Sequence, residues 1–181
     1  MIVGEEGYKA LEKGDLITAY NEFKKAESQA KNPVELSKLL INEGAILIAF
    51  GRFTSAVEKL IKAKSMLSQA ESDKRLLAFA CLNLSKAMLM ANRIQIAESE
   101  ARCAENYLTP DDPHLIFVKA LIMFYKNDLD GLLGLRADSL DEPYRTMVRV
   151  LQLKAKSDEK YLEDLKKLVP SSKLREALGL V

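Results

Sequence analysis

The chain has 181 residues, of which 48% are hydrophobic and 29% are charged, which is enough apolar material for the core of one domain. Its 27 basic and 26 acidic residues nearly cancel, so no overall field attracts nucleic acid or an anionic membrane. The N-terminus lacks the basic and apolar regions of a secretion signal, and no apolar run approaches membrane-spanning length. These features predict a cytoplasmic protein that does not bind membranes.

The two cysteines, Cys81 and Cys103, have neither the spacing of a metal site nor that of a redox motif. A single histidine leaves a zinc site without enough ligands. We therefore expect two ordinary buried or half-buried thiols, with no metal and no cofactor.

A turn followed by a stripe of mostly small residues occurs three times along the chain. Each copy opens on a Gly or Asn, the residues that most easily take the left-handed backbone at a helix end. Three further positions then follow at helical spacing, on one face of a second helix. The copies are Gly14 with Ala19, Phe23 and Ala26; Gly51 with Ala56, Leu60 and Ala63; and Asn92 with Ala97, Ala101 and Ala104.

An apolar helix with its own small residue precedes each of these turns, at Gly7, Gly44 and Ser85. The pattern predicts helix hairpins at about residues 1–31, 34–70 and 74–108. A degenerate fourth copy at 112–136 begins with the N-cap pair Asp112-Pro113 and has its turn at Asn127, and glycines shorten its second helix. Further helices are expected over 141–180, the first of them from after Pro143 to about residue 156.

The combination of Leu40, Gly44 and Leu47 with Ala56 and Leu60 resembles the tetratricopeptide repeat (TPR), whose two helices carry a large-small-large pattern and an A-x-x-x-F pattern. The first copy carries the second-helix pattern too. The resemblance implies an all-α fold, namely a right-handed α-solenoid of antiparallel helix hairpins with a C-terminal helical cap. The whole chain, residues 1–181, would form this single domain.

The same resemblance implies that the first helices line a concave groove that binds a partner. Such an apolar surface is rarely left bare. It could be covered by an amphipathic helix or apolar segment of a partner, by the protein's own C-terminal helices, or by a second copy in a homodimer; alternatively, it could be core between adjacent helices. The expected groove residues are Tyr8, Leu11, Lys38, Ile41, Asn42, Ile48, Phe79, Leu82, Asn83, Lys86, Leu89, Phe117, Phe124 and Tyr125.

Catalysis has little support in the sequence. His114 follows a helix-starting proline, and no nucleophile or carboxylate accompanies it at a recognisable spacing. We expect a non-catalytic adaptor that binds a protein or peptide and no nucleic acid. The alternative is an RNA-binding helical repeat, which would need a basic stripe where only Lys38 and Lys86 lie. A self-associating or enzyme-associated subunit is the third reading.

Overall fold

A computed structural model describes residues 2–70 and 73–157, and every regular element within these ranges is helical. The prediction of an all-α fold is therefore confirmed for this part of the chain. The helices predicted beyond Ser157 lie outside the described residues. The elements are α1 (Glu5–Glu12), α2 (Leu16–Ala26), η1 (Glu27–Gln29), α3 (Pro33–Ala49), α4 (Phe53–Ala70), α5 (Lys74–Met90), α6 (Ile94–Glu105), α7 (Pro113–Tyr125), α8 (Leu129–Gly134), η2 (Ala137–Ser139) and α9 (Tyr144–Ala155).

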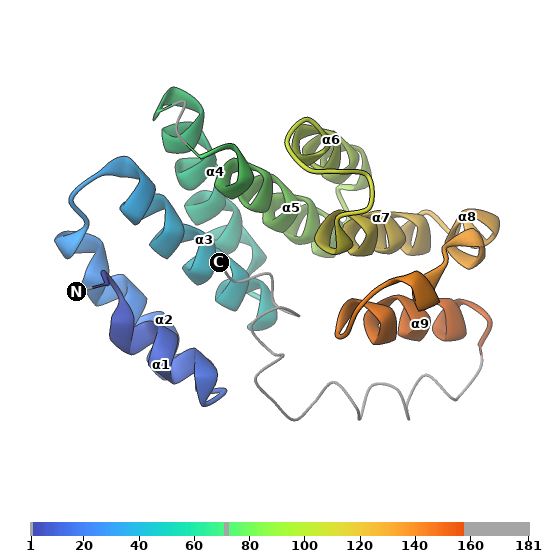
Figure 1. The fold of residues 1–181 in the computed structure, drawn as a ribbon, viewed down its shortest axis with the longest axis horizontal. Helices are drawn as coiled ribbons and strands as arrows, with labels where there is room; N and C mark the ends of the chain where they lie inside the picture. Colours follow the sequence, from blue (N-terminus) through green and yellow to red (C-terminus); the bar gives the residue numbers. More distant parts are fainter. Residues whose placement is uncertain (1, 71–72, 158–181) are drawn as a thin grey trace.

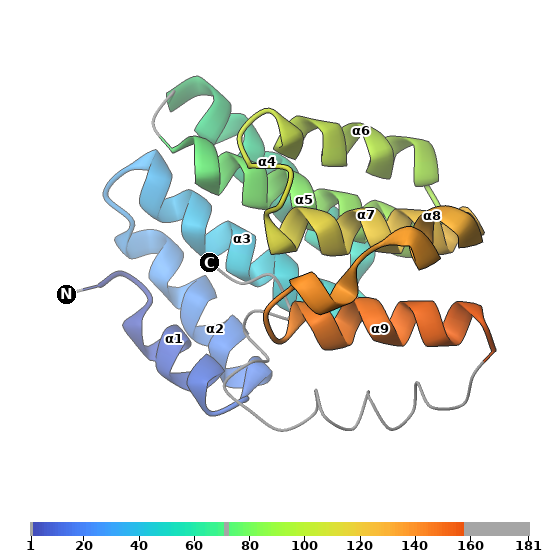
Figure 2. The same ribbon diagram turned by 45° about the vertical axis from the view of Figure 1, so that its right-hand side comes forward.

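Consecutive helices pack against one another, and the chain follows an arc from α1 and α2 at one end to α8 and α9 at the other (Figure 1). Helices two apart in the chain also meet, because α3 contacts α5 and α5 contacts α7. The rotated view keeps α5 between α3 and α7 (Figure 2). These three helices therefore lie side by side, and all three contribute residues to one hydrophobic cluster together with α4 and α6.

The predicted turns are confirmed in their backbone conformation. Gly14, Gly51, Asn92 and Asn127 have φ angles of 74°, 71°, 57° and 58°, all in the left-handed region. The residue after each anchor donates its N–H to a carbonyl five positions earlier, as Arg52 does to Leu47 at 2.8 Å. This is the Schellman ending of a helix, which satisfies carbonyls that the helix itself leaves without partners.

The small-residue stripes are buried where the pattern predicted contact between helices. Gly44 on α3 shows why a small residue is required, because a Cβ at this position would lie 2.6 Å from Leu60 Cγ on α4. Gly7 has the same relation to the Phe23 ring, at 2.6 Å. The stripes of the three second helices, all at most 5% exposed, are Ala19, Phe23 and Ala26; Ala56, Leu60 and Ala63; and Ala97, Ala101 and Ala104.

The later elements also begin and end close to the predicted residues. Asp112 caps α7, its Oδ1 accepting the N–H of His114 at 3.0 Å, and Pro113 is the first helical residue. The glycine-containing α8 has 6 residues, short as expected. Helix α9 ends at Ala155, one residue before the predicted boundary. No helix within the described ranges is long and apolar enough to span a bilayer.

The expectation of two ordinary thiols is wrong. A disulfide joins Cys81 on α5 to Cys103 on α6, and the described residues include no free cysteine. The two residues are 22 positions apart in the sequence, but packing of α6 on α5 brings their Cα atoms to 6.1 Å. That separation is within the range that a disulfide spans. Spacing rules for sequence motifs do not detect a pair that only helix packing brings together.

Candidate functional site

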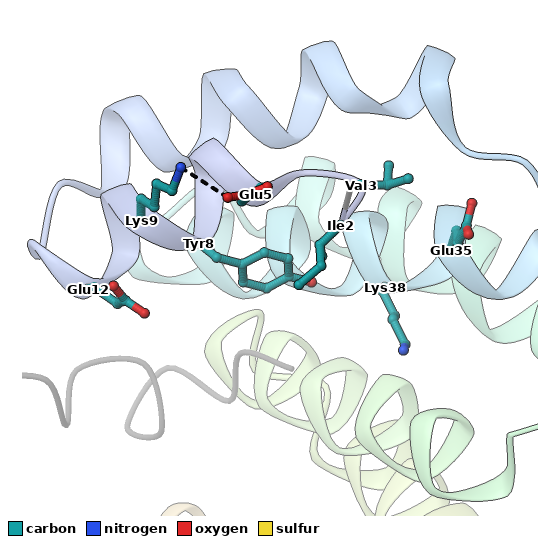
Figure 3. Close-up of a pocket in the computed structure, with 8 residues that line it drawn as sticks. All are labelled: Ile2, Val3, Glu5, Tyr8, Lys9, Glu12, Glu35 and Lys38. Carbon is teal, nitrogen blue, oxygen red and sulfur yellow. Dashed lines mark ion pairs between the residues drawn. The ribbon is translucent and has the colours of Figure 1, made fainter.

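The candidate binding site is a pocket between α1 and the first turns of α3 (Figure 3). Its volume is about 660 Å³, within the usual range for ligand pockets. The described residues that line it are Ile2, Val3, Glu5, Tyr8, Lys9, Glu12, Glu35 and Lys38.

The apolar part of the pocket consists of Ile2, Val3 and the ring of Tyr8. Ile2 is 67% exposed, whereas Val3 and Tyr8 are half-buried. The Tyr8 ring meets the Phe23 ring edge-on, with centroids 5.0 Å apart, and its hydroxyl accepts a hydrogen bond from Asn42 Nδ2 at 3.2 Å. Tyr8 is therefore held in place from two sides, while Ile2 is open to solvent.

The charged part of the pocket contains both paired and unpaired groups. Lys9 lies 3.1 Å from Glu5, and Glu35 Oε2 accepts the N–H of Lys31 at 2.7 Å as part of the N-terminal cap of α3. Glu12 and Lys38 form no ion pair with another described residue. Figure 3 shows them on opposite sides of Tyr8. The pocket thus offers an apolar centre between one acidic and one basic group.

Two residues of the predicted groove, Tyr8 and Lys38, come together in this pocket. Of the others, Tyr125 is 37% exposed, and its hydroxyl donates to Met90 Sδ at 3.3 Å. The remaining positions do not form an open apolar surface. Ile48, Lys86, Phe117 and Phe124 are half-buried, and Leu11, Ile41, Asn42, Phe79, Leu82, Asn83 and Leu89 are at most 8% exposed.

Several of the buried groove positions belong to the hydrophobic core itself. Ile41, Leu82 and Leu89 are in one cluster with residues of α4, α6 and α7. Leu11 is in a second cluster around Phe23. This is the arrangement expected if the apolar residues of the first helices serve as core.

Among the predicted groove residues, Lys86 has a pKa that differs from its ordinary value. Its side chain as a whole is half-buried, but the ammonium is enclosed more deeply, and burial lowers its pKa to about 8. A buried lysine loses hydration of its charged form, which explains the direction of the shift.

The chain's single histidine is a packed residue of the α7 N-terminus. The His114 ring lies between the rings of Phe79 and Tyr144, with both centroid distances 4.7 Å, and its Nδ1 is 3.2 Å from Asp112 Oδ1. Burial lowers the pKa of His114, and the Asp112 carboxylate opposes this only in part. The neutral imidazole is therefore favoured, and its neighbours hold the ring at the start of the helix that Asp112 caps.

A buried charge cluster is a second feature, after the disulfide, that was not predicted from the sequence. Glu43 on α3 has no exposed surface, and its Oε2 lies 2.8 Å from the Lys59 ammonium of α4, which also lies 2.6 Å from Glu27. The contact between Glu43 and Lys59 is an ion pair whose hydrogen-bond geometry is poor, so the buried carboxylate is incompletely satisfied by the described residues. The available signal was an acid, Glu43, inside the largely apolar run from Leu39 to Ala49.

The ionisation of this cluster is uneven. Burial raises the pKa of Glu43 to about 7, because Lys59 only partly offsets the loss of hydration and Glu27 adds a like charge. Burial also acts to raise the pKa of Glu27, but hydrogen bonding and attraction to Lys59 outweigh it, so that pKa falls. One acid and one base of the cluster are therefore firmly charged at pH 7, while the second acid is only partly ionised.

Comparison of the chain with protein-family models, with curated proteins and with solved structures gives no match. The all-α fold and the pocket between α1 and α3 are therefore the basis for assigning a function.

Proposed function

We propose that the protein is a cytoplasmic, non-catalytic adaptor that binds a segment of a partner protein in the pocket between α1 and α3. In this proposal the helix pairs form a right-handed α-solenoid of antiparallel hairpins of the TPR type. The observation that supports binding here is the exposed Ile2 beside the fixed ring of Tyr8, in a pocket of about 660 Å³. An apolar surface backed by a rigid aromatic is typical of the anchor points of protein interfaces.

The charges of the pocket define the chemistry of the segment. An apolar side chain of the partner would pack against Ile2 and Tyr8. A basic residue on one side of it would face Glu12, and an acidic residue on the other side would face Lys38. Such matched charges contribute more to the choice and orientation of a partner than to affinity.

A random-peptide display library, selected on the immobilised protein, tests this proposal. We expect enriched peptides that share an apolar residue between a basic and an acidic one. Ile2→Asp and Lys38→Glu should each weaken binding of the enriched peptides about tenfold or more, a loss typical of interface anchors. Both residues are exposed, so neither change should disturb folding.

Two substitutions on α4 serve as matched controls. Ile61 is 52% exposed and Lys62 is also exposed, and neither lines the pocket. Ile61→Asp and Lys62→Glu should leave peptide binding unchanged. If the controls weaken binding as much as the pocket variants, or if no peptide is enriched, the proposal is wrong.

A further inference from the structure

The two cysteines of the disulfide differ in their exposure to solvent. Cys81 is fully buried in the core on α5, whereas Cys103 on α6 is half-buried. Because the chain has 2 cysteines, no other thiol competes with them. Of the two cysteines, Cys103 is therefore the one that is partly accessible from solvent.

A carboxylate and an ammonium lie next to the sulfurs. An oxygen of Glu100, one turn before Cys103 on α6, lies within 4.8 Å of both sulfur atoms. The Lys64 ammonium of α4 is 2.7 Å from Glu100 Oε2. The carboxylate disfavours a thiolate beside it, and its ion pair with Lys64 offsets the attraction that the ammonium would exert on a thiolate. Exposure, and not a stabilised thiolate, is therefore what distinguishes Cys103 from Cys81.

We propose that Cys81 and Cys103 form a reversible thiol–disulfide site for low-molecular-weight disulfides, with Cys103 as the attacking thiol and Cys81 as the resolving thiol. This inference is independent of the pocket between α1 and α3. It assigns a reaction to each sulfur, beyond the bond that the structure contains.

The reaction takes place in two exchanges. The Cys103 thiolate attacks one sulfur of a disulfide such as oxidised glutathione, which breaks that bond, releases one glutathione thiolate and leaves a mixed disulfide on Cys103. The Cys81 thiolate then attacks Cys103 Sγ, which forms the bond between α5 and α6 and releases the second glutathione thiolate. Two protein thiols are oxidised and one glutathione disulfide is reduced to two thiols. The reverse sequence, with reduced glutathione, opens the site.

The test follows reduced, desalted full-length protein by intact mass after addition of oxidised glutathione. The wild type should form the intramolecular disulfide with little accumulation of adduct. Cys81→Ala should accumulate the Cys103 adduct, because the resolving thiol is absent, whereas Cys103→Ala should react at least about tenfold more slowly, since a buried thiol is poorly accessible. Circular dichroism reports whether each variant is folded.

A measurement on the wild type keeps the test valid if either cysteine variant unfolds. Samples quenched with acid at early times and mapped by peptide mass should carry glutathione on Cys103 and not on Cys81. Early adducts on Cys81, equal labelling of both residues, or no reaction of the folded protein would overturn the assignment.

A charge variant tests the local chemistry separately. Glu100→Gln removes the carboxylate beside the sulfurs and leaves the Lys64 ammonium as the neighbouring charge, which favours the thiolate. A larger thiolate fraction outweighs the accompanying loss of nucleophilicity, so the first exchange should become about threefold faster at pH 7. Glu105→Gln is the matched control, because Glu105 lies on the same helix but pairs with Lys119. An unchanged or slower rate for Glu100→Gln would contradict the role given to the pair of charges.

Discussion

Glu43 is a carboxyl group whose burial couples the stability of the fold to pH. Its pKa is raised from 4.5 to about 7, so between these values the folded protein binds a proton that the unfolded chain has lost. The protonated Glu43 therefore stabilises the folded state fully below pH 4.5, and this stabilisation is lost as the pH rises through 7. The ionised form above pH 7 therefore lowers the free energy of unfolding.

We predict that Glu43→Gln is more stable than the wild type at pH 8 and close to it at pH 4.5. A glutamine keeps the shape of the side chain without a charge, and the gain should be of order 1–3 kcal/mol, since one pKa unit corresponds to about 1.4 kcal/mol. Urea unfolding at both pH values measures the difference. A gain that is the same at both values would show that the charge of Glu43 is not its cause.

Glu27→Gln provides the contrast, because the pKa of Glu27 is lowered instead of raised. The stability from Glu27 is present above its unfolded pKa and is lost as the pH falls through the lower folded value. We therefore expect Glu27→Gln to be less stable than the wild type at pH 8, with the deficit shrinking toward pH 4. Since Glu27 is partly exposed, the deficit should not exceed about 1 kcal/mol.

Gly44 tests the close approach of α3 and α4. A Cβ on Gly44 would lie 2.6 Å from Leu60 Cγ, and Leu60 is fully buried, so it cannot move aside freely. We predict that Gly44→Ala lowers the free energy of unfolding by about 1–3 kcal/mol, despite the better helix propensity of alanine. Gly134→Ala is the control, because nothing lies within 4 Å of a Cβ there. Equal effects of the two changes in urea unfolding would argue against close packing at Gly44.

Among the elements, α5 and α6 are the pair that a covalent bond joins. The Cys81–Cys103 disulfide closes a loop across 22 positions of sequence, which restricts the unfolded chain. We predict that reduction lowers the free energy of unfolding by about 3 kcal/mol, the value of the chain-entropy relation for a loop of this length. Urea unfolding with and without a phosphine reductant measures the loss. A Cys81→Ala/Cys103→Ala variant should not respond to the reductant, and a response from it would point to a different cause.

The helices and turns could be predicted from the sequence because their causes are local. The left-handed anchors need Gly or Asn at Gly14, Gly51, Asn92 and Asn127, and the stripes beside them need small or shape-matched residues at fixed spacing. Asp112 with Pro113 identifies the start of α7 in the same way. Boundaries set by such residues agree with the structure to within a few positions.

The pairings between distant residues could not be predicted, because they depend on how the helices meet. The sequence contains no sign that Cys81 faces Cys103, or that Lys59 reaches Glu43 from the next helix. The exposure of the predicted groove residues likewise depends on how the helices pack. An apolar first-helix residue such as Leu82 has the same sequence pattern whether it lines a surface or fills the core, and its exposed fraction of 2% became known only from packing.

At the scale of the whole molecule, charge balance argues against nucleic acid as the partner. With a formal net charge of +1, the protein lacks the excess of cations that releases counterions from a phosphate backbone. Lys38 lies in the pocket beside Glu5, Glu12 and Glu35, so the pocket itself is not a basic surface. We predict no measurable binding of a fluorescent single-stranded RNA at 150 mM salt, roughly physiological ionic strength. Fluorescence anisotropy is the measurement.

A variant with a basic pocket shows whether the assay could detect such binding. Glu5→Lys/Glu12→Lys replaces two acids that line the pocket with two bases. It should bind the RNA weakly, and the binding should weaken further as salt is added, because each phosphate contact contributes to the salt dependence. The wild type should stay unbound at every salt concentration. Binding by the wild type with a steep salt dependence would instead support the RNA-binding alternative, because only contacts with several phosphates produce that dependence.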